Sequence, residues 1–179
     1  RLDDRDITGD AAHRRARRRI ARTFQAVRLF ANMTVAENIA LPAIATGVAK
    51  RAAFELADSL VEWLSIAELS ARTGNELSYS DERKVSIARA LALKPRFLLM
   101  DEPAAGMSDS DGHLLVEKIR EMPAVYQCGV LLIEHNINLV AAACDRISVL
   151  NFGQTLAAGP PDEILRNASV IDAYLGTEH

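Results

Sequence analysis

Long apolar runs are missing from this 179-residue sequence. Its apolar stretches, such as residues 97–100 and 129–133, are far shorter than the roughly 20 residues that a membrane-spanning helix requires. Cysteine is also scarce, and Cys128 and Cys144 show neither Cys-x-x-Cys nor Cys/His spacing, so no metal site or disulfide framework is indicated. The sequence predicts one soluble domain in a reducing, cytoplasmic setting.

Aromatic residues and net charge are low as well. Aromatic residues make up 5% of the chain, so we interpret Trp63 and Tyr126 as packing residues rather than as an RNA-stacking platform. The net charge of −3 argues against a surface built for nucleic acid. The basic run at residues 14–19 leaves nucleic acid and anionic lipid open as alternatives, but we interpret residues 11–21 as a solvated surface helix. Nucleic acid is therefore not expected as a partner.

The spacing of apolar residues makes the first part of the chain helical. Thr34, with Glu37 three residues later, predicts a capped helix that starts at residue 34 and runs towards residue 41. Between residues 50 and 69, apolar residues recur largely at three- and four-residue steps, which predicts one amphipathic helix. A turn at residues 74–75 ends this helical part.

Beyond that turn, predicted helices alternate with short apolar strands. Glycine and proline at residues 159–161 then end a last short strand and open small C-terminal helices. This alternation predicts an α/β domain with buried parallel strands and a helical insert. The expected helices are residues 81–93, 110–122 and 136–143, and the expected strands are residues 97–100, 129–133 and 146–150.

Two adjacent carboxylates, Asp101 and Glu102, follow the apolar run FLLM at residues 97–100. In open α/β sheets, ligands bind at the carboxyl ends of the strands. The first carboxylate could hold Mg²⁺ through its water shell, and the second could orient an attacking water. The alternative is a core strand that runs into an acidic helix cap. The surrounding motifs favour the first interpretation.

Four motifs stand in a fixed order along the chain. They are RTFQ at residues 22–25, LSYSDERKVSIARAL at 77–91, FLLMDEP at 97–103 and LIEH at 132–135. They resemble, in the same order and spacing, the Q-loop, the signature motif, the Walker B strand with its catalytic glutamate, and the switch histidine of ABC ATPases. The sequence is identified as a member of that family, and the resemblance covers nearly the whole chain.

Further segments resemble one branch of the family, the branched-chain amino-acid importers. They are TFQAVRLF at residues 23–30, DEPAAGM at 101–107, IEHN at 133–136 and AYLG at 173–176. The resemblance implies a bacterial or archaeal peripheral subunit on the cytoplasmic face of the membrane. It would pair with a second ATPase subunit, dock on two membrane permeases and act with a periplasmic solute-binding protein. Import of branched-chain amino acids, or of related amino acids and amides, is the function it implies.

The resemblance also assigns roles around ATP and Mg²⁺. Glu102 would polarise the attacking water, and His135 would hold that water against the γ-phosphate. Asp101 would anchor Mg²⁺, and Gln25 would sense the metal and the water. In the dimer, the start of the signature helix would face the partner's γ-phosphate, because free N–H groups there favour an anion. The residues that would supply these signature contacts are Ser78, Tyr79, Ser80 and Asp81.

The implied fold is an ABC ATPase, P-loop NTPase-like core without its N-terminal strands. The expected parts are a helical signature subdomain at about residues 34–93, an α/β core at about 94–158 and C-terminal helices at 159–179. None of the nine glycines precedes a lysine, so the sequence has no G-x-x-x-x-G-K-[ST] loop, which relatives carry upstream. We expect the chain alone to be inactive, and strand 97–100 to expose an unpaired edge that favours oligomers.

Three positions depart from the family pattern. Ser80 replaces a signature glycine and Asp81 a glutamine, and Ser108 stands where most relatives carry the D-loop aspartate. A hydroxymethyl group and an added carboxylate could crowd and repel a phosphate. These changes and the missing loop leave an alternative open, a truncated or degenerate cassette that docks on permeases without hydrolysing ATP. We interpret His13 and His113 as structural or surface residues.

Overall fold

A three-stranded parallel sheet carries the chain's central elements in the computed structural model, which describes residues 1–174. The strands are β1 (Ile20–Arg22), β2 (Phe97–Asp101) and β3 (Gly129–Ile133), in the order β1-β2-β3. Phe97 lies opposite Ile20 in β1 and opposite Gly129 in β3, so all three strands end at the same edge. The predicted α/β fold class is confirmed. Leu175, Gly176 and His179 lie outside the described residues.

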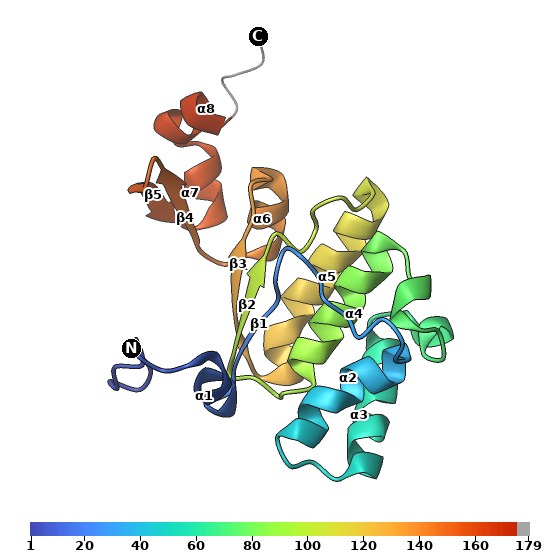
Figure 1. The fold of residues 1–179 in the computed structure, drawn as a ribbon. Helices are drawn as coiled ribbons and strands as arrows, with labels where there is room; N and C mark the ends of the chain where they lie inside the picture. Colours follow the sequence, from blue (N-terminus) through green and yellow to red (C-terminus); the bar gives the residue numbers. More distant parts are fainter. Residues whose placement is uncertain (175–179) are drawn as a thin grey trace.

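Helices α4 (Tyr79–Leu91) and α5 (Asp109–Tyr126) pack on one side of this sheet, and α2 (Val35–Ala45) and α3 (Lys50–Trp63) pack on α4 farther from the strands (Figure 1). The predicted capping box starts α2, because the Thr34 hydroxyl accepts from the Glu37 N–H and the Glu37 carboxylate accepts from the Thr34 N–H. Two short 3₁₀ turns, η1 (Ala67–Leu69) and η2 (Gly74–Glu76), connect α3 to α4.

Apolar side chains of these helices and of the sheet form the main core. Ile39, Leu60, Val85, Leu98 and Met100 are all 1% exposed or less. On the same strand, the alternate residues point to the other side of the sheet. The core therefore lies between the helices and one face of the sheet only.

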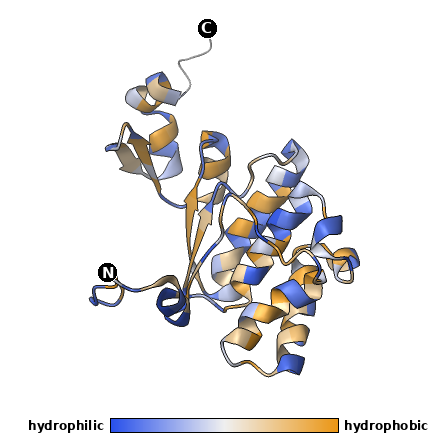
Figure 2. Cartoon of the chain, in the orientation of Figure 1, coloured by the Kyte–Doolittle hydropathy of each residue, from blue (hydrophilic) through white to orange (hydrophobic). Residues whose placement is uncertain are grey.

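The opposite face of the sheet is largely open. Phe97, Leu131 and Ile133 occupy register positions on this face and are 42%, 56% and 54% exposed. Colouring by hydropathy shows apolar strands with no helix over them on this side (Figure 2). The expectation of buried parallel strands is therefore wrong for this face, because no described element covers it.

The expected unpaired edge at residues 97–100 is also wrong. β2 is the central strand and is paired along both sides, with β1 and with β3. Residues 20–22 supply the second neighbour, although the basic composition before them predicted a helix as far as residue 21. That helix, α1 (Ala12–Arg17), ends early because Arg19 turns the chain with a φ of +63° and β1 then pairs with β2. Among the described strands, the edges belong to β1 and β3.

The last part of the chain builds a second, smaller core. β4 (Ile147–Asn151) and β5 (Gln154–Gly159) form an antiparallel hairpin, packed with α6 (Ile137–Ala143), α7 (Pro161–Leu165) and α8 (Ala168–Tyr174). Its buried residues are Ile147, Val149, Ile164 and Val170. The expectation that strand 146–150 joins the parallel sheet is wrong, because its hydrogen-bonding partner is β5. The turn at Phe152 and Gly153 has φ of +47° and +78°, as tight hairpins require.

The two cysteines and the aromatic residues Trp63 and Tyr126 pack in the apolar cores. Cys128 and Cys144 are free thiols, and burial raises the pKa of both. Trp63 and Tyr126 pack edge to face with ring centroids 4.9 Å apart, and burial raises the pKa of Tyr126 to about 12. No helix within residues 1–174 is long and apolar enough to cross a membrane.

Candidate active site

The acidic pair lies where β2 ends. Asp101 is the last residue of the strand, and its carboxylate accepts from the Arg22 guanidinium at 3.0 Å. The Arg22 guanidinium also lies 4.9 Å from the centre of the Phe24 ring. Since both partners are partly exposed, this ion pair holds Asp101 in place without burying it. The chain thus supplies a cation of its own to the carboxylate that was predicted to anchor Mg²⁺.

Glu102 gathers the other predicted catalytic residues. Its Oε2 accepts from Gln25 Nε2 at 2.6 Å, and its Oε1 lies 3.5 Å from His135 Nδ1. Gln25, Glu102 and His135 follow β1, β2 and β3, so the parallel sheet brings together side chains that are up to 110 positions apart in the sequence (135 − 25). A carboxylate, an amide and an imidazole in contact are suited to orienting water.

The backbone of Glu102 takes an unusual conformation. Its φ is +45°, in the left-handed region that residues with a side chain rarely adopt. The Glu102 N–H donates to the Ile133 carbonyl at 2.9 Å, which ties the end of β2 to the end of β3. Positive φ at a non-glycine residue is typical of functional sites, where the surrounding structure maintains it.

The predicted signature residues open helix α4. The Ser78 hydroxyl accepts from the Asp81 N–H at 3.2 Å and donates to the Asp81 carboxylate at 2.6 Å. Asp81 is therefore the reciprocal partner of the helix cap. The Ser80 hydroxyl is buried, so it points into the protein and not to the solvent side of the helix start.

Two groups of predicted site residues remain separate in this chain. Within residues 1–174, no hydrogen bond or ion pair joins Ser78, Ser80 or Asp81 to the Gln25–Glu102–His135 cluster. Ser108, at the departing D-loop position, caps α5 by accepting from the Asp111 N–H at 3.2 Å. The Lys84 ammonium at 3.2 Å and the Ser108 hydroxyl lower the pKa of the Asp111 carboxyl, which joins α4 to α5.

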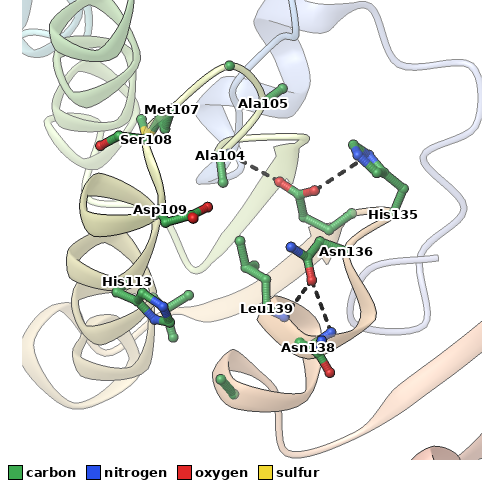
Figure 3. A pocket seen from close by; sticks show the side chains of 15 residues that line it. Ala104, Ala105, Met107, Ser108, Asp109, His113, His135, Asn136, Asn138 and Leu139 are labelled. Atoms are coloured by element: carbon green, nitrogen blue, oxygen red, sulfur yellow. Dashed lines mark hydrogen bonds and ion pairs between the residues drawn. The ribbon is translucent and has the colours of Figure 1, made fainter. Parts of the chain in front are cut away.

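A pocket of about 460 Å³ lies beside the acidic pair, between the loop at residues 104–109, the start of α5, and residues 134–142 (Figure 3). Glu134 is the buried acid of this pocket, with a side chain that is 2% exposed. Its Oε1 accepts from the Ala104 N–H at 3.1 Å, and its Oε2 lies 3.8 Å from His135 Nδ1. Glu134 therefore connects the loop after Glu102 to the end of β3 through this hydrogen bond.

A second cavity, of about 710 Å³, lies between the segment around Gln25 and helix α4. Phe24, Val27 and Leu93 provide apolar lining, and Arg22, Arg89 and Asp101 provide charge. The Arg89 guanidinium donates to the Arg28 carbonyl at 2.7 Å and lies 5.4 Å from the Phe30 ring centre. Gln25 thus both binds Glu102 and lines this groove.

Sequence reasoning missed three residues of this region: Arg22, Arg83 and Glu134. Arg22 and Glu134 stand directly beside predicted motif residues, which is a signal that could have found them. Arg83 stands among other charged residues of α4, and its burial at 3% exposure is visible only in the fold.

Comparison with known proteins identifies the class of the protein. A family model described as ABC transporter matches residues 1–105, which is more than half of the chain. The solved ADP conformation of MJ1267, an ATP-binding cassette of an ABC transporter, matches with a TM-score of 0.79 and 28% identity, over 97% of this chain and 75% of that one. The chain belongs to the ABC transporter family and has the fold of its ATP-binding cassettes.

Similarity extends to one branch of that family. The high-affinity branched-chain amino acid transport ATP-binding protein BraF of Pseudomonas aeruginosa is 37% identical over 98% of this chain and 75% of its own length. LivG of Escherichia coli, which has the same description, is 38% identical over 98% of this chain and 74% of its own length. A second family model, branched-chain amino acid ATP-binding cassette transporter, matches residues 154–179. The resemblance to this branch is confirmed.

Proposed function

We propose that this chain is the nucleotide-hydrolysing subunit of an ABC transporter that imports branched-chain amino acids. The observation that carries the proposal is the similarity to BraF and LivG along 98% of the chain. The match of residues 154–179 to the family model of branched-chain amino acid cassettes supports it. The assembled Gln25–Glu102–His135 cluster supports a catalytic chain over the non-catalytic docking module, which is not favoured.

The residues present fit their expected part of an ATP and Mg²⁺ site. Asp101, Glu102 and Gln25 provide the oxygen donors that Mg²⁺ prefers, at one edge of the sheet. Bound Mg²⁺ would neutralise developing phosphate charge. In this proposal Asp101 holds the metal's water shell, Gln25 orients metal and water, Glu102 polarises the attacking water and His135 positions it. Glu102 with its two contacts is thus the proposed general base.

The signature contacts are proposed to act across a dimer. The start of α4 carries Ser78, Tyr79, Ser80 and Asp81, and its free N–H groups and dipole favour an anion. Because these residues make no direct hydrogen bond or ion pair with Gln25, Glu102 or His135 among residues 1–174, a second ATPase subunit is the proposed source of the phosphate they meet. The second subunit would be another copy or a paralogue.

The remaining partners are two membrane permeases and, indirectly, a solute-binding protein. The groove of about 710 Å³ beside Gln25 supports permease docking near the catalytic cluster, at the cytoplasmic face of the membrane. The proposed parts of the chain are the helical subdomain at about 34–93, the α/β core at about 94–158 and the C-terminal helices at 159–179. We expect the 179-residue chain by itself to be inactive, since it has no lysine loop for the phosphates.

The test uses a complete cassette, defined as this sequence fused behind the segment of a relative that carries the lysine loop. It is reconstituted in proteoliposomes with branched-chain permeases and their solute-binding protein. We expect leucine to stimulate ATP hydrolysis and ATP to drive uptake of labelled leucine. ATP hydrolysis that no branched-chain amino acid stimulates, with no leucine uptake, would contradict the proposed substrate.

A further inference from the structure

Arg83 is a buried cation that the proposed function leaves unexplained. It is 3% exposed, and within residues 1–174 no carboxylate lies within ion-pair distance of its guanidinium. Its Nε is buried without a hydrogen-bond partner. Burying a charge without a counter-ion is unfavourable, so a simple packing role would be better served by an apolar side chain.

The contacts of Arg83 join helix α4 to the catalytic loop. Its Nη1 donates to the Glu102 backbone carbonyl at 3.3 Å, and its Nη2 donates to the Tyr79 hydroxyl. The guanidinium also lies 4.8 Å from the centre of the Tyr79 ring. That ring packs on Gly106, where an added Cβ would come within 2.8 Å of it. The start of the signature helix is therefore in contact with the loop that follows Glu102.

The Glu102 backbone needs such support because its φ of +45° is unfavourable for a residue with a side chain. On its amide side, the N–H donates to the Ile133 carbonyl at 2.9 Å. On its carbonyl side, the oxygen accepts from the Ala105 N–H at 3.2 Å and from Arg83. Among the partners that the structure describes within residues 1–174, Arg83 is thus the one that reaches the Glu102 carbonyl from a distant part of the chain.

We propose that Arg83 is a positioning residue for the reaction: it holds the Glu102 backbone so that the carboxylate faces Gln25 and His135. Because the same guanidinium binds Tyr79, this orientation depends on the first turn of α4. The proposal rests on the proposed function, in which that turn meets the partner subunit's nucleotide. Arg83 would then link the signature contact to the catalytic glutamate within one subunit.

The positioning role is tested on the 179-residue chain by native-state hydrogen exchange of Arg83→Met. We expect the amides of Ala105 and Met107 to exchange on the order of tenfold faster, because a charge-assisted hydrogen bond to the loop is lost. Amides of α3 should keep their protection. Arg83→Lys, which retains the charge and one donor, should give a smaller change and serves as the readout if Arg83→Met does not fold.

Arg89→Met is the matched control. Arg89 is also a partly buried arginine of α4 that stacks on an aromatic ring and donates to a backbone carbonyl, but its partners are Phe30 and Arg28. It should leave the loop amides unchanged. Equal loop protection in the Arg83 and Arg89 variants would overturn the proposal. So would faster exchange of loop and α3 amides alike, since that result describes a structural residue only.

Steady-state kinetics of the complete cassette test whether the hydrogen bond from Arg83 to Glu102 affects turnover. We expect Arg83→Met to lower kcat about 10- to 100-fold with the KM for ATP unchanged, because a misplaced base affects the chemical step and not ground-state binding. Tyr79→Phe should have a smaller effect of the same kind. An unchanged kcat would overturn the link to catalysis. A complete cassette that hydrolyses no ATP would instead count against the proposed function, while the hydrogen-exchange result would stand.

Discussion

The two sides of the parallel sheet differ in how completely they are packed. On the helical side, Ile39 of α2 and Leu60 of α3 are fully buried in the main core. On the other side, Leu131 and Ile133 remain more than half exposed, although they belong to a strand of high apolar content. The hairpin β4–β5 buries its own small core beside this open side.

The residues that stabilise the fold and the residues proposed for catalysis therefore lie in different parts of the molecule. Stability comes from the helical side, where apolar burial contributes about 25 cal/mol per Å². The proposed catalytic cluster of Gln25, Glu102 and His135 lies at the carboxyl edge of the sheet, where the His135 side chain is 72% exposed. A mutation on the helical side should therefore change folding, and one at the edge should change turnover.

The largest expected effect is at the catalytic edge. In the complete cassette, Glu102→Gln should lower ATP hydrolysis by about 10²- to 10⁴-fold, because the proposed general base is lost. ATP binding and the melting temperature should persist, since the amide keeps the shape of the side chain. Turnover, nucleotide binding and thermal unfolding are measured on the same preparation.

Glu117→Gln is the control, since Glu117 is an exposed residue of α5. It should hydrolyse ATP at the unmodified rate. Normal hydrolysis with glutamine at position 102 would show that another group activates the water. A large loss of melting temperature in Glu102→Gln would break the separation between stability and chemistry.

The next effect compares the two faces directly. Leu60→Ala should destabilise the chain by about 2–5 kcal/mol, because it leaves a cavity in a dry core. Leu131→Ala removes the same number of atoms from an exposed face and should change stability by less than about 0.5 kcal/mol. Urea denaturation of both variants measures the difference. Equal losses would mean that the open face is covered in solution, for example by a second copy.

Most elements of the helical side could be predicted from the sequence because their signals are local. The reciprocal Thr34–Glu37 cap and the apolar periodicity of α3 depend on residues three or four apart. The predicted end of α3 was too late, since Ser65 turns the chain with a φ of +57° and a 3₁₀ turn follows. Such a reversal has no clear sequence signal when the residue is not glycine.

Contacts across the sheet could be predicted only through the motif resemblance. The hydrogen bond from Gln25 to Glu102 spans 77 positions, and nothing in local spacing indicates it. The short β1 was missed because pairing with β2, rather than composition, makes residues 20–22 extended. Arg83 was missed for a related reason, since its burial depends on the loop that packs over α4.

A smaller effect is expected at the start of the signature helix, where the two regions meet. In the complete cassette, Asp81→Gln should raise turnover or ATP-driven dimerisation a few-fold, because it removes a carboxylate that repels phosphate and that binds the Ser78 hydroxyl at 2.6 Å. Ser80→Gly should add little to this gain, since the Ser80 hydroxyl is already buried. Steady-state ATPase rates of the single and double variants separate the two contributions. Lower turnover in Asp81→Gln would show that the loss of the Ser78–Asp81 cap outweighs the relief of charge repulsion with phosphate.

The smallest expected effect concerns the ion pair that joins α4 to α5 on the helical side. The Lys84 ammonium lowers the pKa of Asp111 below that of an unfolded aspartate, which is about 3.9. The pair therefore contributes its full stability above about pH 4–5 and loses it as the pH falls through the lowered pKa.

Both side chains of this ion pair are partly exposed, at 19% and 31%, so its contribution to stability should be below about 1 kcal/mol. Urea unfolding at a series of pH values from 7 downwards should show Asp111→Asn less stable than the original chain at pH 7, with the difference shrinking as the pH falls below about 4. Asp109→Asn, in the same helical turn, removes a charge without breaking this pair and should show a smaller difference at pH 7. A difference that does not change with pH would assign the effect to the Ser108 cap and not to the ion pair.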